Sequence, residues 1–128
     1  MLRFASLGFV LSFLGCADES VTGYADRNAV YRLIEIAGAE PELDADLTFP
    51  SRGAIRVETS CGLYEISTDV PYPWIAMSRA VVTPRECDAR GADAIFFGEM
   101  MRVTLAEVTG PVLILTTDDG DLLVFRAE

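Results

Sequence analysis

Short apolar runs follow one another along most of the chain, and several of them alternate with charged residues. Ile55-Arg56-Val57-Glu58 has the two-residue period of a strand with one solvated face. Turn residues such as Gly38, Pro50 and Pro71 separate this run from its neighbours. Further β-rich runs cover residues 30–36, 47–49, 63–66, 74–77, 80–82, 112–115 and 122–125. The pattern predicts a mainly β domain.

The period changes between Asp88 and Val103, where apolar residues recur three and four positions apart. This spacing predicts a single helix. Asp88 and Asp93 would suit its positive N-terminal end, and Arg102 its negative C-terminal end. Ala92 and Ile95 follow this spacing, together with a Met and Phe stripe formed by Phe96, Met100 and Met101. We expect the Met and Phe stripe to lie in the core rather than to form a ligand site.

The last two strands, residues 112–115 and 122–125, are apolar on both faces, which predicts that both faces are covered. Asp119-Gly120 between them is a strong hairpin signal. A calcium loop is the functional alternative. It does not fit, because Thr117 and Leu115 would occupy positions that require acidic ligands.

The N-terminal segment has the layout of a secretory signal: one cation at Arg3, an apolar stretch from Phe4 to Leu14, and Gly15 before Cys16. The stretch is shorter than the roughly 20 apolar residues that cross a bilayer. Residues 12–16 resemble the lipobox of bacterial lipoproteins, in which the cysteine is lipidated and becomes the new N-terminus. We therefore expect a signal peptide at residues 1–15 and a lipid on Cys16. The alternative is an ordinary signal peptide, or a buried N-terminal strand, with Cys16 an incidental thiol.

A polar segment without helical or strand period follows Cys16 as far as Asn28. We expect residues 16–28 to be a flexible tether that holds the domain roughly 20 Å from the anchor. Residues 29–128 are then long enough for one domain with one core.

The chain contains no histidine and no lysine, so all ten of its cations are arginine. This composition excludes Ser-His-Asp and Cys-His mechanisms, histidine zinc sites and Schiff-base chemistry. From residue 16 onward the chain has nine arginines and twenty acidic residues, which gives a net charge of −11. Nucleic acid and anionic lipid would be repelled. We interpret the acidity as a solubilising surface, with an acidic binding face as the alternative.

Three short motifs lie in order along the chain: Tyr-Arg-Leu-Ile-Glu-Ile-Ala-Gly at residues 31–38, Ser-Cys-Gly-Leu-Tyr at residues 60–64 and Thr-Pro-Arg-Glu-Cys at residues 83–87. Together they resemble the META domain, the family of HslJ-like bacterial envelope proteins. The first is similar to the family's opening W-x-L-x-x-I-x-G, with Tyr31 in the tryptophan's place. The second resembles G-C-N-x-Y with Gly62 in place of the asparagine, and the third keeps the outer residues of T-x-M-A-C. The resemblance runs from Tyr31 to Phe125. It implies an antiparallel β-barrel-like fold with one packed α-helix, and a family whose biochemical activity is largely undefined.

Cys61 and Cys87 remain as a pair if Cys16 carries a lipid. In an oxidising envelope such a pair is expected to form a disulfide. A redox-active or metal-binding pair is the alternative, but the chain has no C-x-x-C motif and no evident third ligand.

These observations favour a non-catalytic envelope lipoprotein that binds a partner or supports the cell surface. We expect a monomer, lipid-anchored and facing the periplasm at the outer rather than the inner membrane, with no metal and no cofactor. The alternative is a carrier or inhibitor of a small apolar ligand, with Tyr72 and Trp74 at the mouth of the barrel. A hydrolase using two carboxylates ranks third, because no pair of acids is marked by its spacing.

Overall fold

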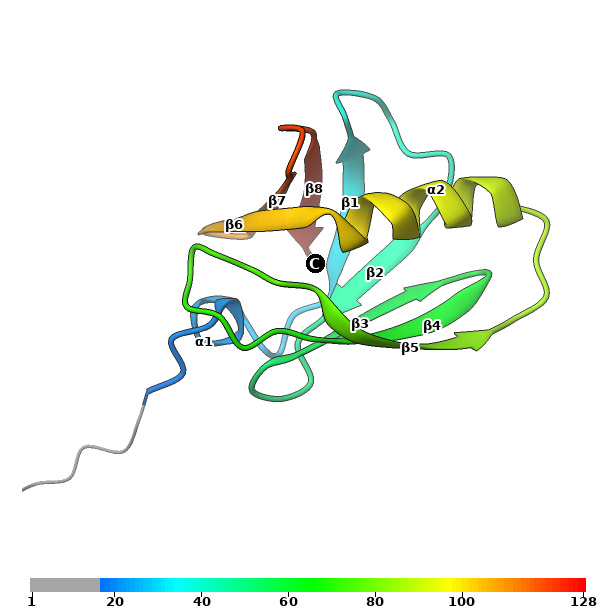
Figure 1. Cartoon of the computed structure of the whole chain (residues 1–128). Helices are drawn as coiled ribbons and strands as arrows, with labels where there is room; N and C mark the ends of the chain where they lie inside the picture. The colour runs from blue at the N-terminus through cyan, green and yellow to red at the C-terminus, as the bar shows by residue number, and fades with distance from the viewer. Residues whose placement is uncertain (1–16) are drawn as a thin grey trace, which may run out of the picture.

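The chain forms an eight-stranded antiparallel sheet in the computed structural model, which describes residues 17–128. The elements are α1 (Val21–Tyr24), β1 (Tyr31–Ile36), β2 (Ala45–Thr48), β3 (Ala54–Thr59), β4 (Gly62–Ser67), β5 (Ser78–Pro84), α2 (Arg90–Met101), β6 (Val103–Thr109), β7 (Val112–Thr117) and β8 (Leu122–Ala127). The strand order is β5-β4-β3-β2-β1-β8-β7-β6, and the sheet curls into a half-barrel (Figure 1). This confirms the predicted mainly β, antiparallel fold with one packed helix. The predicted signal peptide, residues 1–15, and Cys16 lie outside the described residues.

Alternation in the strands places the apolar residues on the inner face of the curl. In β3, Ile55 and Val57 are buried while Arg56 and Glu58 are exposed, as the sequence predicts. The interior is filled by side chains from the sheet and from α2. The bulkiest of them are Tyr31, Phe49, Phe96 and Phe125, each at most 1% exposed.

Helix α2 connects the two edge strands, β5 and β6, and is shorter than the predicted helix of residues 88–103. Phe96 and Met100 are buried in the core, which confirms the interpretation of the apolar stripe for these two residues. Ile95, which follows the same helical spacing, is 67% exposed. Residues 93, 96 and 100 are three and four positions apart and share the inward side of the helix, whereas Ile95 lies off that side.

The strands β7 and β8 are covered on one face only, which corrects the expectation that both faces are covered. Leu113, Leu115, Leu123 and Phe125 are buried, whereas Leu122 is 39% exposed and the other side chains of the outer face are half-buried or exposed. The turn between the strands is the predicted hairpin. Gly120 has a φ of +87°, a left-handed conformation that favours glycine.

The expected strand at residues 74–77 does not join the sheet beside β5. Instead the segment pairs with β6 through a bridge between Trp74 and Leu105. The Ile75 N–H donates to the Thr104 carbonyl at 3.0 Å, and the Ala106 N–H donates to the Pro73 carbonyl at 2.8 Å. The loop before β5 therefore covers part of the β6 edge, whose backbone groups would otherwise face solvent.

The expected tether is wrong for the residues from Asp18 onward, because this segment packs against the domain. Ser20, Val21 and Thr22 are 7%, 1% and 0% exposed. Val21 belongs to the core cluster, and the Gly53 N–H donates to the Thr22 hydroxyl at 3.0 Å. The folded unit thus includes the segment from Asp18 onward and does not start at residue 29.

Candidate binding surface

A disulfide joins Cys61, at the turn between β3 and β4, to Cys87, in the segment that precedes α2. The two Cα atoms are 5.0 Å apart, within the usual range for a bridge. The predicted pairing is therefore confirmed. The bridge fixes the chain that leaves β5 to the β3–β4 hairpin and so positions the start of α2.

A buried polar cluster ties α2 to the same hairpin. Asp93, 6% exposed in the first turn of α2, accepts hydrogen bonds from the Tyr64 and Thr59 hydroxyls. The Tyr64 ring also stacks on Phe97, with ring centroids 4.6 Å apart. Burial of Tyr64 and its hydrogen bond to Asp93 raise the pKa of the phenol to about 12.

The sequence interpretation treated Asp93 only as a charge suited to the helix dipole and missed this cluster. Its position three residues before Phe96 was the available signal, because it places the carboxylate on the buried side of the helix. The Asp93 carboxylate accepts both of these hydrogen bonds from side chains of the β3–β4 hairpin, and they hold the helix to the sheet. We interpret the cluster as a structural anchor.

The two predicted binding residues, Tyr72 and Trp74, lie on one turn but have different surroundings. Tyr72 is half-buried: its ring stacks on Tyr24 with centroids 4.2 Å apart, and its hydroxyl accepts the Val108 N–H at 3.0 Å. Trp74 is 60% exposed. The structure thus gives Tyr72 a packing role and leaves Trp74 as the side chain available for contact.

The backbone around Trp74 is fixed on several sides. The Trp74 N–H donates to the Pro71 carbonyl at 2.9 Å, and the peptide bond before Pro73 is cis, which together form a type VI turn. The Tyr72 N–H donates to the Glu19 carbonyl at 2.7 Å. With the two hydrogen bonds to β6, these contacts present an exposed indole on a well-anchored loop.

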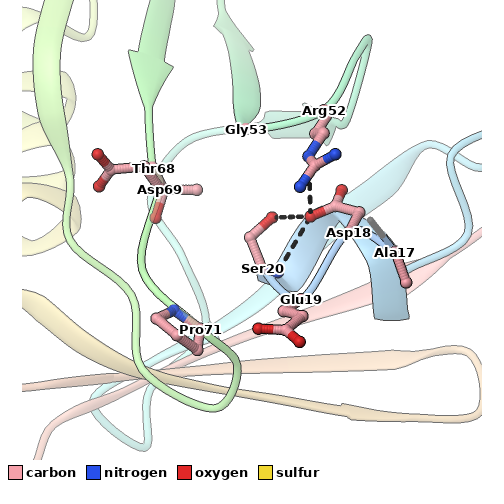
Figure 2. Close-up of a pocket in the computed structure, with 9 residues that line it drawn as sticks. All are labelled: Ala17, Asp18, Glu19, Ser20, Arg52, Gly53, Thr68, Asp69 and Pro71. Carbon is pink, nitrogen blue, oxygen red and sulfur yellow. Dashed lines mark hydrogen bonds and ion pairs between the residues drawn. The ribbon is translucent and has the colours of Figure 1, made fainter. Parts of the chain in front are cut away.

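A cleft of about 560 Å³ lies beside this turn, where three distant segments meet. Its lining comes from the N-terminal segment, the turn before β3 and the loop after β4: Ala17, Asp18, Glu19, Ser20, Arg52, Gly53, Thr68, Asp69 and Pro71 (Figure 2). Neither Tyr72 nor Trp74 lines this cleft. Sequence reasoning did not find the cleft, because no local pattern joins three segments so far apart in the chain.

Asp18 is the most constrained acid of the cleft. Its Oδ1 accepts the Ser20 N–H at 3.0 Å and the Ser20 hydroxyl at 2.6 Å, and its Oδ2 accepts the Thr22 hydroxyl. The Arg52 Nε lies 4.0 Å from Oδ1. Figure 2 marks this ion pair with a dashed line. Burial alone would raise the pKa of Asp18, but the hydrogen bonds from Ser20 and Thr22 lower it overall. A carboxylate held in this way is a weak base, and its evident role is to fold the N-terminal segment.

Gly53 allows the turn before β3 to approach the loop after β4. Its φ is +72°, and a Cβ at this position would lie 2.8 Å from the Thr68 carbonyl oxygen. The Thr68 N–H donates to the Gly53 carbonyl at 2.9 Å. Only glycine combines this conformation with such a close approach.

Two further features of the described residues bear on the site. No helix within residues 17–128 has the length and apolar character needed to cross a bilayer. Within the same range, no three or more acidic or cysteine side chains are grouped so that they could hold a metal ion.

Comparison with known proteins finds no matching family model and no matching curated protein. Among solved structures, the chain is similar to the NMR structure of a protein from Burkholderia xenovorans. The match has a TM-score of 0.61 with 16% sequence identity, and it covers 84% of this chain and 86% of the other. At this identity the similarity shows a shared fold alone.

Proposed function

We propose that the protein is a lipid-anchored envelope protein that faces the periplasm and acts by binding rather than by catalysis. The signal layout ending at Cys16 supports the anchor. The Cys61–Cys87 disulfide supports an oxidising compartment, because such bonds persist outside the reducing cytosol. We also propose that the protein belongs to the META-domain family, because of the three motifs at residues 31–38, 60–64 and 83–87. The last two of these motifs contain Cys61 and Cys87.

The exposure of Trp74 on a fixed loop is the observation that carries the binding role. Folding normally removes a side chain of this size from water, and Trp is enriched among residues that dominate binding energy. Because the loop is already held by hydrogen bonds to Glu19, Thr104 and Ala106, little conformational entropy would be lost when Trp74 meets a partner.

The filled interior favours this role over that of a small-ligand carrier. Tyr31, Phe49, Phe96 and Phe125 occupy the inside of the curled sheet, where a carrier would need a cavity. The cleft beside Asp18 is partly polar, and the Asp18 carboxylate is engaged by Ser20 and Thr22. Neither feature suits an apolar ligand.

The experiment compares unacylated protein, carrying Cys16→Ser, with the same protein carrying a second substitution at Trp74. Trp74→Ala should leave the far-ultraviolet circular dichroism spectrum and Tm nearly unchanged and should sharply reduce sedimentation with envelope membranes. Val82→Ala, at a side chain that is 44% exposed on β5, is the matched control and should sediment like the parent. Equal sedimentation of the two folded variants would contradict the proposed role of Trp74.

A further inference from the structure

We propose that the surface formed by Trp74 and Tyr24 rests against the headgroup region of the bilayer that holds the Cys16 lipid. This inference depends on the proposed lipid anchor and names the partner of the Trp74 surface: a lipid surface with zwitterionic headgroups. The domain would then lie directly on the membrane instead of standing away from it on a tether.

The first argument is the short distance between the predicted lipid and the folded domain. After cleavage before Cys16, only Ala17 separates the lipidated residue from Asp18, whose carboxylate is already hydrogen-bonded to Ser20. A chain extends at most about 3.6 Å per residue, so Asp18 lies within about 7 Å of the Cys16 Cα atom. The face around Asp18 must therefore lie close to the headgroups.

The second argument is that Trp74 belongs to this face. Glu19, next to Asp18, accepts the Tyr72 N–H at 2.7 Å, and Trp74 follows within the same turn. Tyr72 in turn stacks on Tyr24, the last residue of α1. Figure 1 shows the described N-terminal segment, α1 and the loop before β5 on the same side of the molecule, away from most of α2.

The third argument is the chemistry of the exposed groups. Tyr24 and Trp74 are 55% and 60% exposed. Tyr and Trp are enriched at membrane–water interfaces, because their rings combine an apolar body with a polar group that can stay hydrated. Glu19 and Asp69, both exposed beside the same turn, together with the net charge of −11, disfavour anionic lipid. A zwitterionic surface therefore fits this face.

The test uses Trp74 as its own reporter, because it is the single tryptophan of the chain. The mature acylated protein is reconstituted into phosphatidylethanolamine and phosphatidylcholine vesicles in which some acyl chains carry bromine. We expect the Trp74 emission to shift to the blue and to lose most of its intensity, with the strongest quenching from bromines nearest the headgroup. Acrylamide, a water-soluble quencher, should reach Trp74 less than in the unacylated Cys16→Ser protein free in solution.

The matched control moves the tryptophan to another surface. In the Trp74→Phe, Ile95→Trp double variant the reporter replaces a side chain that is 67% exposed on α2. We expect no bromine quenching of this variant, whose fold is checked by circular dichroism. Equal quenching at both positions would mean contact without a preferred face and would overturn the proposal.

The outcomes separate this proposal from the one on which it rests. If mass spectrometry finds the acyl group but Trp74 in vesicles stays unquenched and open to acrylamide, the membrane contact is refuted while the anchor stands. Trp74 would then be available for a protein partner. If Cys16 carries no lipid, the anchor and the membrane contact fail together.

Discussion

Removing the Cys61–Cys87 disulfide should lower the free energy of unfolding by an amount set by the length of the loop that the bridge closes. The bridge closes a separation of 26 residues. In the chain-entropy model, a loop of this length contributes about 3.5 kcal/mol to the free energy of unfolding. Small domains are stable by about 5 to 15 kcal/mol in total, so the bridge supplies a large share. For a domain of this size, the loss corresponds to a fall in Tm of about 15 °C.

The assay is equilibrium unfolding in urea of oxidised and reduced protein, alongside the Cys61→Ala, Cys87→Ala double variant. The reduced protein keeps both sulfur atoms, so it separates the loss of the cross-link from the loss of packing around the buried Cys61 side chain. Glu86→Ala, at the exposed neighbour of Cys87, is the control and should unfold with the parent. A difference below about 0.5 kcal/mol between oxidised and reduced protein would refute the reasoning, because that is the scale of ordinary surface changes.

Two further predictions test the packed N-terminal segment and the helix anchor. Asp18→Ala removes the acceptor of three hydrogen bonds and should lower the free energy of unfolding at pH 7 by about 1 to 2 kcal/mol, whereas Glu19→Ala, at an exposed neighbour, should change it little. The pKa of Asp18 is lowered in the folded protein, so the difference in free energy of unfolding between Asp18→Ala and the parent should shrink as the pH falls below 3.8. If Asp18→Ala has no effect on urea unfolding at pH 7, the N-terminal segment is a flexible tether after all. Tyr64 has a folded-state pKa of about 12 against 10.0 for the free group. Its contribution to the free energy of unfolding is therefore complete below pH 10 and is lost as the pH rises towards 12. Stability measured over this range should therefore fall less steeply in Tyr64→Phe than in the parent, and equal slopes would show that Tyr64 does not titrate in this way.

The strands whose pattern repeats locally could be predicted from the sequence. Alternation in residues 55–58 and the Asp119-Gly120 turn depend on neighbours in the chain, and the structure confirms both. The sequence pattern does not predict strand β6, because Val103, Leu105 and Ala106 follow the apolar end of α2 with no break. A bulge between Val103 and Leu105 also disturbs the two-residue period on which a strand prediction depends.

The candidate site was predicted only in part, because contacts between distant segments create it. Tyr72 and Trp74 were selected as aromatic residues beside prolines, but only tertiary packing buries one ring against Tyr24 and leaves the other exposed. The sequence of the N-terminal segment predicts a tether, because a four-residue helix has no visible period. Its anchor is the hydrogen bond from Gly53 to Thr22, a contact across 31 positions that no local pattern reports.

Mass spectrometry of the mature protein purified from bacterial membranes tests the central claim most directly. The proposed lipid anchor predicts that the N-terminal peptide begins at Cys16, continues as Ala17-Asp18-Glu19, and carries the mass of attached acyl chains. An N-terminal peptide that begins elsewhere, or one that begins at Cys16 with an unmodified thiol, would contradict it.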